Sequence, residues 1–176
     1  MVTASDLTAM AAFTEGHYAQ AFPSFGSERT GAPVVSYCRI EDREIRTREP
    51  VLEPDVIIVQ DSTLLAVMDV FSGLQPGGYA LINSRKPVEE LVQDGVLKDV
   101  DPGCVTTVPA SDIAREHLGR PLPNAALLGA MAALTGLVNI DSVEGAIKER
   151  FGGRLGESNS AAARAAYDYV KENADA

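Results

Sequence analysis

The segment "DVIIVQ", residues 55–60, decides the fold class. Its four central residues are all apolar and β-branched, without the alternation that a strand with one wet face shows. Such a run is typical of a strand that is covered on both faces, as in parallel sheets. Two similar runs follow, "YALINS" at 79–84 and "CVTTVP" at 104–109. We therefore expect a sheet of parallel strands at the centre of the molecule.

A helical pattern follows each of these three runs. Residues 61–74 carry an apolar stripe after a possible cap at Asp61 or Ser62, residues 87–95 begin with proline, and residues 110–119 end with glycine. Three strand–helix units in a row predict a parallel sheet with helices on its faces. The expected fold class is α/β, with a Rossmann-like and mostly parallel sheet.

The other segments are assigned by the same rules. Residues 2–16 are expected to form an opening helix and residues 17–22 a short strand. Residues 33–48 are expected to form a β-hairpin that turns at Glu41-Asp42, with charges of alternating sign. Those charges either protect a solvated hairpin or make a charged docking face for a partner. Residue 122 onward is expected to be helical, which gives a single domain over 1–176.

The helical third contains three predicted helices, at 122–136, 140–153 and 160–176. Asp141 and Glu144 have the spacing of a capping box at the start of the second. No internal repeat or low-complexity linker divides the chain.

Composition excludes several classes of function. The 176 residues carry a net charge of -10, and no long basic run is present, so neither nucleic acid nor an anionic membrane surface is an expected partner. No apolar run reaches the roughly 18 residues of a membrane span, and no signal peptide is evident. The two cysteines cannot hold an iron–sulfur cluster alone. A disulfide between them is possible, but we expect free thiols in a cytoplasmic chain.

A search for catalytic and phosphate-binding motifs finds none. The sequence contains neither G-x-G-x-x-G nor the P-loop pattern, and no G-x-S-x-G. His17 and His117 have no motif partner, and Cys38 is most simply a small core residue. Asp61 follows a strand at the ligand side of a parallel sheet, although helix capping explains it equally well.

The chemically richest segment is "FPSFGSERTGAPV", residues 22–34. Gly26, Gly31 and Pro33 suit a loop that leads into a strand. Two aromatic side chains that look exposed, beside an arginine, are instead typical of a protein interface. From chemistry alone the segment is either a turn or a docking surface.

Four segments in the same order resemble one family. "YAQAFPSFGSERTGAPV" (18–34) is similar to Y-x-Q-x-F-P-x-F-G-x-E-R-x-G-A-P-V, and "EPDVIIVQDSTLL" (53–65) to E-P-D-x-x-x-x-x-D-x-x-L-L. "GLQPGGYALIN" (73–83) resembles G-L-K-x-G-G-x-x-x-x-N, and "LPNAALLGAMAALTGLV" (122–138) resembles N-x-x-x-L-G-A-x-x-x-x-T-G-L. These are motifs of the gamma subunit, or fused gamma domain, of 2-oxoacid:ferredoxin oxidoreductases, the pyruvate synthase group.

The start of the chain departs from this family. Its members usually begin with a strand and G-x-G-G-Q-G, directly before the helix that carries "VTA". Met1 stands where that loop is expected to end, so we expect the usual N-terminal strand and glycine-rich loop to be missing. A contact with phosphate or coenzyme A through that loop is correspondingly in doubt.

The resemblance implies a complex in which this chain is an accessory part. The complex would decarboxylate pyruvate or a related 2-oxoacid to an acyl-CoA and pass electrons to ferredoxin. Thiamine diphosphate and magnesium would be held by alpha and beta subunits, and 4Fe–4S clusters by beta and a ferredoxin-like delta subunit. This chain would bind none of these cofactors alone and carry no catalytic residue or metal.

The resemblance also implies a docking role for the 22–34 segment. The residues expected at the subunit interface and at the approach to the active site are Phe22, Phe25, Gly26, Glu28, Arg29, Gly31, Ala32 and Pro33. Within this set Arg29 is the expected anion contact, oriented by Glu28. The competing hypotheses are a stand-alone Rossmann-like module that binds coenzyme A or a nucleotide, and an independent enzyme.

Overall fold

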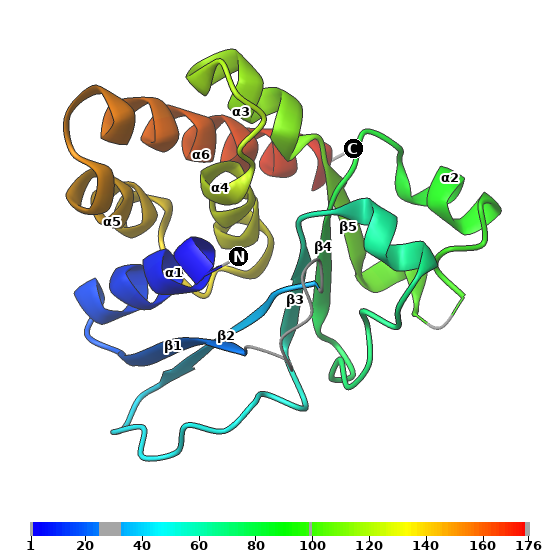
Figure 1. Cartoon of the computed structure of the whole chain (residues 1–176), viewed down its shortest axis with the longest axis horizontal. Coiled ribbons are helices and arrows are strands. Elements are labelled where there is room, and N and C mark those ends of the chain that lie inside the picture. The colour runs from blue at the N-terminus through cyan, green and yellow to red at the C-terminus, as the bar shows by residue number, and fades with distance from the viewer. Residues whose placement is uncertain (1, 25–32, 99, 175–176) are drawn as a thin grey trace.

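The computed structural model describes residues 2–24, 33–98 and 100–174. The elements are α1 (Val2–Thr14), β1 (Tyr18–Ser24), β2 (Val35–Glu41), β3 (Val56–Val59), η1 (Ser62–Ala66), β4 (Tyr79–Asn83), α2 (Val88–Gln93), η2 (Pro102–Cys104), β5 (Val105–Val108), α3 (Ala110–Leu118), α4 (Asn124–Thr135), α5 (Ile140–Phe151) and α6 (Gly153–Ala174). Figure 1 shows a three-stranded sheet between helices, with a separate two-stranded hairpin below α1. None of the helices in the described residues is both long and apolar enough to cross a bilayer.

The three expected strands form a parallel sheet in the order β3-β4-β5. The middle strand is β4, in which Ala80, Leu81 and Ile82 are completely buried. A strand with wholly buried side chains on both faces needs a layer of structure on each side. The prediction of a parallel sheet covered on both faces is therefore confirmed.

The side chains of β4 alternate between two hydrophobic clusters. Leu81 belongs to the larger cluster, with buried residues of α1, α4, α5 and α6. Ala80 and Ile82 belong to the smaller one, with Phe71 and with Leu91 of α2. In Figure 1 the four larger helices lie on one side of the sheet and α2 lies on the other. The molecule consequently has three layers, and most of its core lies on the α4–α6 side.

The helix expected at 61–74 is wrong. The Asp61 carboxylate does accept a hydrogen bond from the Thr63 backbone N–H, at 3.0 Å, but the structure that follows is only the short 3₁₀ turn η1. Asp69 then accepts from the Phe71 N–H at 3.2 Å, which favours a turn over a continuing helix. Phe71 still reaches the smaller cluster, whereas Val67 is 75% exposed. Apolar residues spaced as in a helix therefore belong here to a compact turn.

The hairpin also differs from the prediction. Strand β2 pairs antiparallel with β1, from Tyr18↔Glu41 to Ser24↔Val35, and residues 43–50 form no strand. Between residues 43 and 48 charges fall on both faces and Ile45 is the one large apolar side chain, so that segment cannot bury a face. Strand β1 takes the place of that segment as the partner of β2, and it packs small apolar residues such as Ala19 against the larger hydrophobic cluster.

Two features of the helices depend on how they pack. Phe13 lies on the exposed side of α1 at 73% exposure, because the buried face of this helix is formed by Leu7 and small alanines. Asp141 and Glu144 do not form a capping box: both bind the guanidinium of Arg164 on α6, at 2.6 and 2.5 Å. The two carboxylates therefore stabilise the contact between α5 and α6.

Helices α4 and α6 lie in close contact at Gly129. A Cβ atom on Gly129 would lie 1.8 Å from the backbone oxygen of Ala163, well inside van der Waals contact. Residues 125–133 of α4 are all buried, and small residues let its backbone lie against α6. The "LGA" part of the sequence motif is explained by this packing.

Replacing Gly129 with alanine is expected to destabilise the chain by about 2–3 kcal/mol, because the added methyl group forces two helices apart. Urea unfolding followed by circular dichroism measures this change. The matched control is Gly145→Ala on α5, where a Cβ meets nothing within 4 Å. That control should stabilise the chain by about 0.5–1 kcal/mol, and equal effects of the two variants would contradict the packing argument.

Candidate functional site

The structure describes two of the eight residues that sequence analysis places at an interface. Phe22 is buried, at 7% exposure, so the expectation that it is an exposed aromatic is wrong. Its ring lies 5.5 Å from that of Tyr37, and the guanidinium of Arg48 lies 5.9 Å above it. Phe22 therefore anchors the hairpin internally. Pro33, by contrast, is exposed.

The other six residues lie outside the described part of the chain: Phe25, Gly26, Glu28, Arg29, Gly31 and Ala32. The strand residues next to this segment are described. Ser24 and Val35 are register partners at the end of the β1–β2 pair. Ser24 and Val35, the strand residues on either side of this segment, therefore lie at the same end of the hairpin.

A polar pocket lies at the carboxyl ends of the parallel strands. It has a volume of about 480 Å³, and its lining residues are Gln60, Asp61, Ser62, Asn83, Ser111, Pro121 and Pro123. They come from the ends of β3 and β4, from the first turn of α3 and from the loop before α4. Open parallel sheets bind ligands at this edge. Sequence analysis placed Asp61 here, and the structure brings the other residues beside it.

Asn83 ties the elements around this pocket together. Its Nδ2 donates to the Gln60 backbone oxygen at 2.9 Å and to Ser111 Oγ at 2.8 Å, and its Oδ1 accepts from the Ser111 N–H at 3.1 Å. Gln60 in turn donates through its side chain to Asn124 at the start of α4. Sequence reasoning missed Asn83. An amide at the end of a buried strand was the signal that could have identified it.

The charged side chains at this edge already make contacts within the chain. Hydrogen bonds from Thr63 lower the pKa of Asp61, which holds it ionised as a cap. Asp112 binds Arg85 in a bidentate pair and Arg115 at 2.7 Å, and the hydrogen bond from Arg85 is the main cause of its lowered pKa. The residues that line the pocket can supply hydroxyl and amide hydrogen bonds, and the one charged residue among them, Asp61, already accepts hydrogen bonds from Thr63.

The described residues contain no grouping of three His, Cys, Asp or Glu suited to a metal ion. His17 Nδ1 lies 3.0 Å from Asp42 Oδ1 at the open end of the hairpin, which makes it a structural contact between two elements. Burial, with a smaller contribution from Asp6, raises the pKa of Cys38 to about 12. A thiol with that pKa is protonated at neutral pH and is a poor nucleophile.

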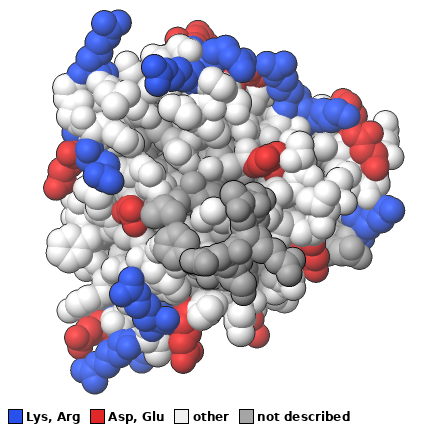
Figure 2. Space-filling view, in the orientation of Figure 1, with Lys and Arg blue, Asp and Glu red and all other residues white. Residues whose placement is uncertain are grey.

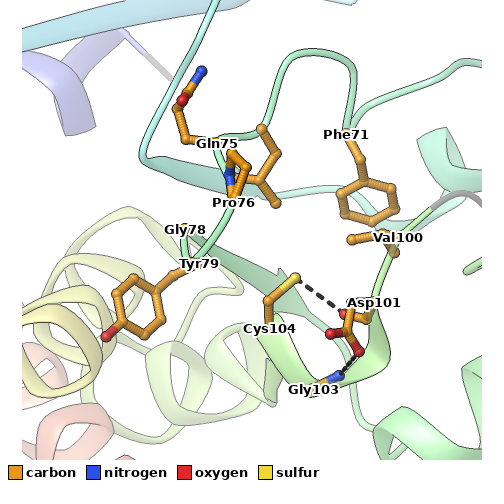
Figure 3. A pocket seen from close by; sticks show the side chains of 11 residues that line it. Phe71, Gln75, Pro76, Gly78, Tyr79, Val100, Asp101, Gly103 and Cys104 are labelled. Atoms are coloured by element: carbon orange, nitrogen blue, oxygen red, sulfur yellow. Dashed lines mark hydrogen bonds between the residues drawn. The ribbon is translucent and has the colours of Figure 1, made fainter.

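A second cavity, of about 630 Å³, lies at the other end of the sheet. Figure 3 shows its wall, where the Cys104 thiol donates to the Asp101 backbone oxygen at 3.0 Å and the Asp101 carboxylate accepts from the Gly103 N–H. These residues precede β5 and those around Pro76 precede β4. Ligands of parallel sheets bind at the opposite edge, so we assign no site to this cavity.

The model of the pyruvate ferredoxin/flavodoxin oxidoreductase family matches residues 1–169, and the chain belongs to this family. Among its relatives is the common gamma subunit of the pyruvate/ketoisovalerate oxidoreductases of Thermococcus kodakarensis. The two are 48% identical over 167 residues, which cover 95% of this chain and 89% of the relative.

Solved structures agree with this assignment. The pyruvate oxidoreductase subunit PORC (EC 1.2.7.1) of Thermotoga maritima matches with a TM-score of 0.77 and 35% identity, over 95% of this chain and 88% of that one. The 2-oxoglutarate:ferredoxin oxidoreductase of Magnetococcus marinus, solved with 2-oxoglutarate, coenzyme A and succinyl-CoA bound, matches with a TM-score of 0.71. At 17% identity, over 97% of this chain and 29% of that one, it shows a shared fold. The sequence resemblance and the α/β fold class are confirmed.

Replacing Asn83 with alanine is expected to destabilise the chain by about 2–4 kcal/mol, because three hydrogen bonds are lost and the Ser111 N–H is left without its acceptor. Urea unfolding gives the change in free energy. The control is Asn173→Ala, which removes one exposed hydrogen bond to Tyr169 and should cost less than about 0.5 kcal/mol. A similar small cost at Asn83 would show that it does not tie the elements together.

Proposed function

We propose that this chain is the gamma subunit of a thiamine diphosphate-dependent 2-oxoacid:ferredoxin oxidoreductase. The complex would convert pyruvate or a related 2-oxoacid to an acyl-CoA and pass the electrons to ferredoxin. The observation that carries this proposal is the match to a gamma subunit over 95% of the chain at 48% identity. The likeness to the Thermotoga maritima subunit supports pyruvate as one candidate substrate.

In the proposed complex the cofactors lie on partner chains. A 4Fe–4S cluster needs four thiolates and this chain has two cysteines, so its residues do not fit a cluster. Thiamine diphosphate and magnesium would be held by the alpha and beta subunits, and the clusters by beta and the ferredoxin-like delta subunit. This chain would pack against them in the cytoplasm and contribute surface to the active-site approach.

The composition of the 22–34 segment supports a docking role. Aromatic residues and arginine are enriched among the residues that contribute most to binding, and the segment contains both. Figure 2 shows many of the Lys and Arg side chains near the rim of the face that it draws. In our proposal Phe25, Gly26, Glu28, Arg29, Gly31, Ala32 and Pro33 contact the catalytic subunits from the end of the hairpin, with Phe22 as their internal anchor. Arg29 would bind a carboxylate or phosphate.

Replacing Arg29 with alanine in the purified complex is expected to raise the Michaelis constant for the 2-oxoacid or coenzyme A about tenfold, because a charge-assisted hydrogen bond is lost. Steady-state kinetics and gel filtration measure this effect and the assembly. The control is Arg154→Ala, an exposed arginine on α6 for which no ion pair is seen among the described residues. Unchanged assembly and unchanged Michaelis constants for the Arg29 variant would exclude this role.

The pocket at the carboxyl edge of the sheet favours a second candidate, a stand-alone module that binds coenzyme A or a nucleotide. The starts of α3 and α4 both border that pocket, and neither is capped by the side chain of the proline that precedes it, although Asn83 accepts from the Ser111 N–H of α3. Titration calorimetry of the full chain with coenzyme A separates the two candidates. We expect weak or no binding without the partner subunits, and tight binding would favour the stand-alone module.

A further inference from the structure

The hairpin of β1 and β2 has two faces, and different parts of the chain cover them. Ala19 and Ile40, which are register partners, pack against the larger hydrophobic cluster on the side of α1. Because side chains alternate along a strand, Gln20 and Phe22 lie on the opposite, outer face, and yet Phe22 is buried. In Figure 1 residues 43–50, which we call the strap, run on the side of the hairpin that faces away from α1.

Two arginine side chains connect the strap to the outer face of the hairpin. The guanidinium of Arg48, in the strap, lies 5.9 Å above the ring of Phe22. Arg39 of β2 reaches the strap from the hairpin: it donates to Thr47 Oγ1 at 2.8 Å and to the Glu49 backbone oxygen at 3.5 Å. The strap is therefore closed over the outer face by contacts of side chains.

The strap has little else to hold it in place. Within the described residues none of its members takes part in a backbone–backbone hydrogen bond. Ile45, its one large apolar side chain, belongs to neither hydrophobic cluster. A segment with few buried apolar contacts and an unpaired backbone opens locally at a much lower cost than the core does. The contacts of Arg39 and Arg48 are therefore the main ones that keep the strap closed.

The chain is fixed on both sides of the strap. Just before it, His17 Nδ1 lies 3.0 Å from Asp42 Oδ1. Just after it, the Gln75 N–H donates to the Pro54 backbone oxygen at 2.9 Å. These contacts confine an opening movement to the residues between them, so the strap can open as one unit while the hairpin and the sheet keep their structure.

Closure of the strap has a cost at Gln20. The side-chain oxygen of Gln20 is buried and has no donor among the residues that the structure describes. Gln20 is the register partner of Arg39, so it lies on the face over which the strap closes. A buried acceptor without a donor has lost its bond to water and gained none in return. Opening of the strap returns water to this oxygen.

We propose that the strap is a lid on the outer face of the hairpin, and that it opens and closes while the rest of the chain stays folded. Arg39 and Arg48 hold the lid closed, and the buried Gln20 oxygen favours its opening. The open state exposes the ring of Phe22, which the closed state buries. This inference goes beyond the proposed function and does not depend on it, because both parts of the lid belong to this chain.

The first test uses the full chain and measures the rate at which trypsin cleaves after Arg46, an exposed residue of the strap. Cleavage of a locally opened segment follows the population of the open form. Arg39→Met removes both hydrogen bonds to the strap, so cleavage should become about tenfold faster. Gln20→Met removes the unmade bond, so cleavage should become about tenfold slower. Gln93→Met, at an exposed position of α2, should leave the rate unchanged.

The second test separates local opening from unfolding of the whole chain. Gly129→Ala lowers the global stability at the contact between α4 and α6, which does not involve the strap. Because the lid opens locally, cleavage after Arg46 should keep its wild-type rate in this variant. Urea at concentrations below the unfolding transition makes the same comparison in the unmodified chain, where the cleavage rate should stay nearly constant.

Two results overturn the inference. An unchanged cleavage rate in either Arg39→Met or Gln20→Met shows that trypsin cuts the strap in its closed form. Cleavage that accelerates in Gly129→Ala, or in dilute urea, in proportion to the loss of global stability shows that the strap opens only when the chain unfolds. Neither result bears on the proposed function, which co-purification with the partner subunits tests.

Discussion

The complete burial of strand β4 is the constraint on which the rest of the structure depends. Ala80, Leu81 and Ile82 alternate between two hydrophobic clusters, so helices must cover both faces of the sheet. Because β4 is fixed on both sides, the residue at its end, Asn83, has a defined position. Asn83 in turn holds the ends of β3 and β4 against the start of α3 and forms the polar pocket there. The packing of the core therefore determines where the carboxyl edge of the sheet, with its polar pocket, lies.

Prediction from sequence succeeded where one local signal determines the outcome. Continuous apolar runs identified the three parallel strands, and glycine correctly ended α3. Prediction failed where a local pattern fits one structure and the side chains make a different contact. Asp69 interrupts an apolar stripe that resembles a helix, and Asp141 and Glu144 bind Arg164 rather than cap α5. At the site, Asp61 was found by its place after a strand. Phe22 is buried, and its ring lies under Arg48, 26 positions away, a contact that no local sequence pattern contains.

Close packing accounts for three of the described glycines in the sequence motifs. A Cβ on Gly73 would lie 2.0 Å from the Leu52 oxygen, one on Gly78 would lie 2.7 Å from the Asp55 oxygen, and Gly129 meets α6. "GLQPGG" and "LGA" therefore secure the turn before β4 and the contact between α4 and α6. Most of the 22–34 segment, from residue 25 to residue 32, lies outside the described residues, and its role stays the docking role that we propose.

The hairpin shows how a small two-stranded sheet is held on this fold. A two-stranded sheet is marginal in water unless something packs against it. Here α1 covers one face, through Ala19 and Ile40, and the ring of Phe22 packs with Tyr37 and under the guanidinium of Arg48. The Gln20 oxygen is buried without a donor among the described residues, which costs stability. The contacts that α1 and Arg48 make with the hairpin must offset this cost, so the hairpin depends on segments outside its two strands.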